Sequence, residues 1–163
     1  MTEQYISGYL DAISRVKDMI TPNMGGTNKF FKIPKENHHP LLDNIKNYLF
    51  KHREWYTKYH DSLPEILNHL KLIEIENWKD NLQTLIAEWT CDEMLKSTIG
   101  DHGYSFSEYL IRFLLSELFQ NQEVKVFKMM PNHIIWHWGD HVSEEYVFET
   151  EDSIFIMHFG EIS

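Results

Sequence analysis

The stretch VKVFKMMPNHIIWHWGDHVSEEYVFETEDSIFIMHF (Val124–Phe159) decides the fold class, because its apolar residues alternate with a period of two. Pairs typical of turns, such as Gly139-Asp140 and Glu151-Asp152, divide it into short runs at hairpin spacing. Sequential strands joined by such short turns are antiparallel neighbours. The stretch therefore predicts a four-stranded antiparallel meander over about residues 123–160, with strands at Val124–Met129, His133–Trp138, Glu145–Glu149 and Ile154–Phe159.

Upstream of this stretch the apolar period is 3.6, which is typical of helices. About five helices are expected over about residues 1–121, with the main apolar stripes in 3–20, 41–59, 62–73, 78–89 and 105–118. The last of these is the most apolar, and we expect it at the centre of the core. Lys29–Ile33 is expected to be extended, and Leu72–Glu76 alternates like a strand. The chain is thus predicted to be one α+β domain (1–163) with helices covering one face of the meander.

The composition places the chain among folded proteins of a reducing compartment. Apolar residues make up 42% and aromatic residues 14% of the sequence, enough to offset the entropy of ordering the chain. The single cysteine, Cys91, cannot form an internal disulfide. No signal peptide is apparent, and no run approaches the roughly 18 apolar residues of a membrane span. We expect a cytoplasmic protein.

The net charge of −10 is unevenly distributed. Residues 129–163 carry seven acids and no Lys or Arg, whereas residues 29–58 carry seven basic residues and three acids. The overall charge disfavours nucleic acid, because contact with phosphate requires a cationic surface. An acidic carboxy-terminal part instead suits a basic protein partner.

The histidines of the meander suggest a metal, but the predicted strand argues against it. His133 and His137 would lie roughly 13 Å apart along a strand, too far to share an ion bound at about 2 Å. The weaker alternative is a site formed across the hairpin by His137, Asp140, His141 and His158. No metal and no other cofactor is expected. Cys91 could be a nucleophile beside a distant histidine, but no flanking motif supports catalysis.

The interpretation that best fits these features is a small acidic inhibitor that binds a basic protein, of the physical type of bacterial immunity proteins that neutralise a cognate toxin. Aromatic anchors among carboxylates are typical of such a surface. The residues expected to bind the partner are Trp138, Asp140, Glu144, Glu145, Tyr146, Glu149, Glu151 and Asp152. A metal-dependent or histidine-based hydrolase and an acidic mimic of nucleic acid are the alternatives.

Overall fold

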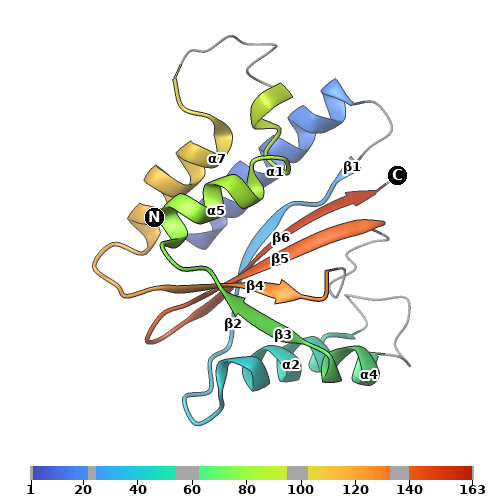
Figure 1. Ribbon diagram of the computed structural model, residues 1–163, viewed down its shortest axis with the longest axis vertical. Helices are drawn as coiled ribbons and strands as arrows, with labels where there is room; N and C mark the ends of the chain where they lie inside the picture. Colours follow the sequence, from blue (N-terminus) through green and yellow to red (C-terminus); the bar gives the residue numbers. More distant parts are fainter. Residues whose placement is uncertain (1, 22–24, 54–62, 95–102, 133–139, 163) are drawn as a thin grey trace.

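A computed structural model describes residues 2–21, 25–53, 63–94, 103–132 and 140–162. One antiparallel sheet of six strands runs through the middle of the molecule, in the order β1-β6-β5-β4-β3, with β2 also paired to β6 (Figure 1). The strands are β1 (Gly25–Gly26), β2 (Lys29–Ile33), β3 (Lys71–Glu74), β4 (Lys125–Met130), β5 (Val142–Glu149) and β6 (Ile154–Ile162).

Helices cover both faces of this sheet, in contrast to the single covered face that we predicted. On one face lie α1 (Glu3–Ile20), α5 (Trp78–Ile86) and a helix formed by α7 (Phe106–Tyr109), η2 (Leu110–Leu115) and α8 (Ser116–Leu118). On the other face lie α2 (Leu41–Lys51) and α4 (Leu63–Asn68). The two layers of helices enclose two separate apolar clusters, one on each side of the sheet.

The α+β class is confirmed, but the count of four strands is wrong. The segments predicted at Val124–Met129, Glu145–Glu149 and Ile154–Phe159 correspond to β4, β5 and β6. The predicted strand His133–Trp138 lies outside the described residues. Lys29–Ile33 is extended as expected, and it joins the sheet beside β6, with Phe31 opposite Ile156.

Alternation along β5 and β6 divides the strand residues between the two clusters. Tyr146, Phe148 and Phe159 face α1, α5 and η2, and all three are fully buried. Val147 and Ile156 point to the opposite face and pack with residues of α2 and α4. Because both faces of these strands are covered, polar side chains in their middle, such as Glu145 and His158, are removed from water.

The helix from Phe106 to Leu118 begins as the sequence indicates. The hydroxyl of Ser105 accepts a hydrogen bond from the backbone N–H of Glu108 at 3.2 Å, as in a capping box. Its middle part, η2, is a π-helix, a local widening that is often found at functional sites. None of the helices in the described ranges is both long enough and apolar enough to cross a bilayer.

Candidate functional site

A buried charged cluster is centred on His158 in β6. The register of the sheet places Glu145 of β5 on one side of His158 and Lys29 of β2 on the other. Nδ1 of His158 lies 2.9 Å from Oε1 of Glu145, and Nε2 lies 2.9 Å from Oδ2 of Asp140. Both nitrogens of the imidazole therefore have a carboxylate partner, and the side chains of all three residues are removed from solvent.

Asp140 is also held in this cluster by Thr27, which is itself bonded to β6. The hydroxyl of Thr27 donates a hydrogen bond to Oδ1 of Asp140 at 2.7 Å and also lies 3.3 Å from Nε2 of His158. The backbone N–H of Thr27 donates to the carbonyl of Gly160 at 3.0 Å. A Cβ at position 160 would collide with the Asp140 carboxylate and the Thr27 hydroxyl. The close approach of Asp140 to β6 thus requires glycine at position 160.

The electrostatics of this cluster favour a charged histidine. Burial lowers the pKa of His158, but the hydrogen bonds from its ring to Asp140 and Glu145 outweigh that effect, and the pKa is raised. Burial also lowers the pKa of Lys29, against the opposing charge of Asp140. The geometry is that of an imidazolium donating to two carboxylates, which is a structural arrangement for a buried cation.

Of the residues proposed for a metal, Asp140 and His158 lie in contact, but the geometry around them is not that of a metal site. His158 has both ring nitrogens occupied by carboxylates, and His141 is exposed. A metal ligand must offer a free nitrogen lone pair, which His158 does not do in this arrangement. His137 lies outside the described residues.

The residues predicted to bind a partner fall into three groups. Asp140, Glu145 and Tyr146 are buried, so a partner cannot reach them in this structure. Glu151 and Asp152 are exposed at the turn between β5 and β6. Glu149 is partly exposed and pairs with Lys35 at 3.1 Å. Glu144 is treated separately below, and Trp138 lies outside the described residues.

Glu144 is the centre of a second polar cluster, on the face of the sheet that α1 and α5 cover. Its carboxylate accepts hydrogen bonds from Lys128 at 2.8 Å, the Tyr146 hydroxyl at 2.8 Å and Nε1 of Trp89 at 3.1 Å. Burial raises the pKa of Glu144, but these donors outweigh it and the pKa is lowered. Nδ2 of Asn132 is a fourth donor at 3.3 Å, so this carboxylate stabilises the fold and has little capacity left for a partner.

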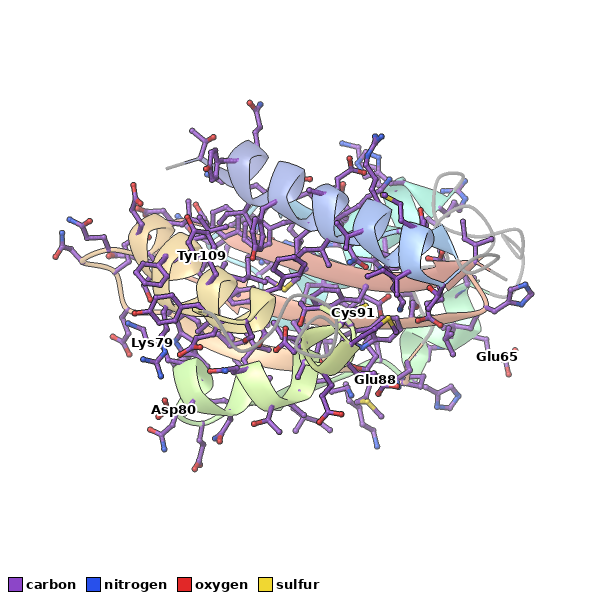
Figure 2. All side chains as sticks on the ribbon, turned by 90° about the horizontal axis from the view of Figure 1, so that it is seen from above. Glu65, Lys79, Asp80, Glu88, Cys91 and Tyr109 are labelled. Atoms are coloured by element: carbon purple, nitrogen blue, oxygen red, sulfur yellow. The ribbon has the colours of Figure 1, made fainter. Side chains whose placement is uncertain are left out.

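Cys91 does not have the surroundings of a nucleophile. The thiol is buried, and burial raises its pKa, with the charge of Lys17 only partly opposing this effect. A reactive cysteine needs the thiolate, which a lowered pKa and access to solvent would favour. Cys91 lies near the end of α5 (Figure 2), where it acts as a small core residue.

A group of aromatic side chains lies exposed on the outside of the same helical layer, where α1 meets α7 and η2. We call three exposed rings that contact one another the aromatic patch: Tyr104 (56% exposed), Tyr109 (38%) and Phe113 (41%). The ring centroid of Tyr109 lies 5.2 Å from that of Phe113 and 5.5 Å from that of Tyr9. The rings of Tyr104 and Phe113 meet edge to face at 4.9 Å. Figure 2 shows Tyr109 beside α1.

Tyr109 and Phe113 of the aromatic patch were missed in the sequence because they share a helix with core residues. The whole helix was expected at the centre of the core; its residues Leu110 and Leu114 lie there, but Tyr109 and Phe113 are exposed. Tyr9 packs beneath Tyr109 of the patch, and its hydroxyl donates to the carbonyl of Phe106 at 3.1 Å. Burial raises the pKa of this hydroxyl, so it stays a donor.

Comparison with known proteins gives the fold and nothing more specific. Neither a protein-family model nor a curated protein sequence matches the chain. The crystal structure of citrus MAF1 is similar, with a TM-score of 0.52 over 95% of this chain and 99% of that one, at 13% sequence identity. At that identity the likeness extends to the arrangement of helices and strands, and this chain shares an α+β fold with citrus MAF1.

Proposed function

We propose that this protein is an inhibitor that binds and blocks a basic protein, such as a bacterial toxin domain, and that the aromatic patch is its anchor. The observation that carries the proposal is the gathering of three exposed rings, in contact with one another, on an acidic chain. Contiguous exposed apolar surface of this kind marks sites of interaction in soluble proteins.

The composition of the patch supports a protein partner. Tyrosine is enriched among the residues that dominate binding energy, because it offers a large flat surface with few rotatable bonds. Two of the three rings are tyrosines, and each hydroxyl can also donate to or accept from a partner. The ring contacts of Phe113 with Tyr104 and Tyr109 hold it in place before any partner arrives. Side chains that are already ordered lose less entropy on binding.

Charge supports a basic partner rather than an acidic one. The chain carries a net charge of −10, which attracts a cationic protein over distances of several ångströms and raises its rate of association. Around the patch, Glu108 is paired with Arg112 at 3.1 Å, and Glu117 is exposed one turn beyond Phe113. Glu151 and Asp152, at the turn between β5 and β6, contribute to the same long-range attraction.

The hydrolase alternative gains no support from the described residues. His158 is buried with both nitrogens paired, and the Cys91 thiol is buried with a raised pKa. A general base must reach the proton that it removes, directly or through one water. Neither His158 nor Cys91 is in such an accessible position.

The test is a binding experiment with the purified product of the neighbouring gene, first at low salt and then at high salt. We expect a stable complex at low salt whose rate of association falls as salt screens the charges. Phe113→Ala should weaken it at least about 30-fold, the effect of losing an energetically dominant residue. The matched control is Phe50→Ala, because Phe50 is similarly exposed (47%) on α2, on the other side of the sheet.

Two results would overturn the proposal. One is the absence of a complex at low salt with any basic neighbouring gene product. The other is a complex that Phe113→Ala and Phe50→Ala weaken equally, which would show that the aromatic patch is not the anchor. The folded state of each variant is checked by circular dichroism, so that loss of binding is not confused with loss of structure.

A further inference from the structure

We infer a second, independent site: Glu36, His38 and His39 form a binding site for Zn²⁺ in the loop between β2 and α2. Nε2 of His38 lies 3.5 Å and Nε2 of His39 lies 3.6 Å from the same carboxylate oxygen, Oε2 of Glu36. One ligand atom from each of the three residues can be chosen so that all lie within 4.8 Å of one another. Among the residues that the structure describes, this is the only group of three such ligands that converges in this way.

The spacing of the donors fits a tetrahedral zinc ion. Zinc binds imidazole nitrogen and carboxylate oxygen at about 2.0–2.2 Å, so two ligands at the tetrahedral angle lie about 3.4 Å apart. The two distances from the Glu36 oxygen are close to that value without any movement of the loop. Two histidines and one glutamate are a known set of three zinc ligands, which leaves a fourth position for water.

A buried asparagine fixes the backbone that carries the three ligands. Asn44, in the first turn of α2, accepts a hydrogen bond from the N–H of Glu36 at 2.8 Å. Its amide nitrogen lies within hydrogen-bond distance of three loop carbonyls, those of Glu36, His39 and Pro40. The N–H of His39 also donates to the carbonyl of Glu36 at 3.0 Å, which closes the turn. The loop is thus anchored to a helix at both ends of the ligand set.

The second nitrogen of His39 has a neighbour that can orient the ring. Nδ1 of His39 lies 3.4 Å from the side-chain amide of Asn47, one turn further along α2. With its amide turned over, Asn47 accepts a hydrogen bond from Nδ1–H and leaves the lone pair of Nε2 for the metal. Such an outer hydrogen bond is a regular feature of histidines that bind zinc.

The ligand types exclude calcium and magnesium, and the tetrahedral spacing favours zinc among the remaining metals. Imidazole suits zinc, copper and nickel, whereas calcium and magnesium require oxygen ligands. The location at the amino-terminal end of α2 disfavours a cation slightly, since the helix dipole is positive there. The carboxylate of Glu36 supplies an opposing negative charge at shorter range.

The experiment is calorimetric titration of the tag-free, chelator-treated protein with zinc chloride. We expect saturation at one zinc ion per chain, a rise of the melting temperature with added zinc, and at least a tenfold loss of affinity in His38→Ala and in Glu36→Gln. His69→Ala is the matched control, because His69 is also exposed but lies in the turn between α4 and β3. This variant should bind zinc as the wild type does.

The double variant His38→Ala/His39→Ala separates this site from any other. Both side chains project from a loop, and their removal leaves the bonds of Asn44 in place, so we expect a folded protein. Saturable binding of one zinc ion by this double variant with unchanged affinity would overturn the inference, as would the absence of saturable binding by the wild type. Neither result bears on the binding of a protein partner.

Discussion

His158 and Asp140 form a fully buried ion pair, with Nε2 of the imidazole 2.9 Å from Oδ2 of the carboxylate and neither side chain in contact with solvent. The two residues belong to the buried charged cluster around His158, which interrupts the otherwise apolar interior. Helices cover both faces of the sheet that carries it. A buried charge is tolerated when partners compensate it: the imidazolium of His158 lies between the carboxylates of Asp140 and Glu145, and the hydroxyl of Thr27 donates to Asp140.

Removing His158 should destabilise the protein strongly. His158→Ala leaves two buried carboxylates without their cation, and breaking a buried pair in this way costs about 3–5 kcal/mol of unfolding free energy. Urea denaturation measures the change. The control is His141→Ala, which removes an exposed histidine nearby and should change stability by less than about 0.5 kcal/mol. Equal effects of the two substitutions would show that the buried pair does not stabilise the fold.

The stability supplied by His158 should fall as the pH rises. Its pKa in the folded protein is raised above the ordinary value of about 6.5 in the unfolded chain. The contribution is therefore fully present below about pH 6.5 and is lost as the pH passes through the folded pKa. The free energy of unfolding, measured by urea between pH 6 and 9, should decline with a slope of up to about 1.4 kcal/mol per pH unit.

The imidazole itself provides a check that does not depend on a variant. In an NMR titration of the wild-type protein, the ring resonances of His158 should shift with a midpoint at a higher pH than those of an unstructured histidine. His158→Asn cannot titrate at this position. In this variant the decline of the unfolding free energy over the same pH range should therefore lack the part that His158 contributes. A His158 that titrates below about 6.5 would contradict the proposed imidazolium.

Substitution of Gly160 should also disturb the buried charged cluster around His158. A methyl group in Gly160→Ala would overlap the Asp140 carboxylate and the Thr27 hydroxyl, and overpacking of this kind costs about 1–3 kcal/mol. Gly8→Ala is the matched control, because a Cβ there meets nothing within 4 Å. Since Gly8 lies inside α1, alanine should instead stabilise the protein by about 0.5–1 kcal/mol. Opposite signs in urea denaturation are the expected result.

The local sequence pattern was sufficient to locate β4, β5 and β6, which follow one another along the chain. It was insufficient to predict the pairing of β1 and β2. The period of two in the last part of the sequence found β4, β5 and β6, whose pairing is between neighbours along the chain. β2 was expected to be extended, but its partner β6 lies more than 100 residues away, and no local period encodes that pairing. β1 consists of Gly25 and Gly26, which carry no side-chain pattern at all.

Whether a candidate site residue is exposed or buried depends on which faces of the helices and strands are covered. Acids and histidines on β5 and β6 looked like surface residues because an antiparallel meander often has one face in water. Here α2 and α4 cover the second face, so Glu145 and His158 became partners in the interior. Conversely, the apolar stripe of the helix at 106–118 is wider than the contact it makes, which leaves Tyr109 and Phe113 outside.

The two components of the proposed partner surface should separate in binding kinetics. Phe113→Ala removes a ring from the aromatic patch and should mainly increase the rate of dissociation, because truncation of an anchor loses short-range contacts. Glu151→Lys, on the exposed turn between β5 and β6, should mainly reduce the rate of association and the dependence of that rate on salt. Surface plasmon resonance at two salt concentrations measures both rates.

A charge reversal at a distant position tests whether the rate of association depends on where the charge lies or only on the net charge. Glu65→Lys changes the net charge by the same amount as Glu151→Lys, but it lies in α4, at the opposite end of the molecule from Tyr109 (Figure 2). If attraction is concentrated on one side, Glu65→Lys should reduce the rate of association by a smaller factor than Glu151→Lys. Equal reductions would assign the steering to the total charge of −10, and the turn at Glu151 would then have no special place in the encounter.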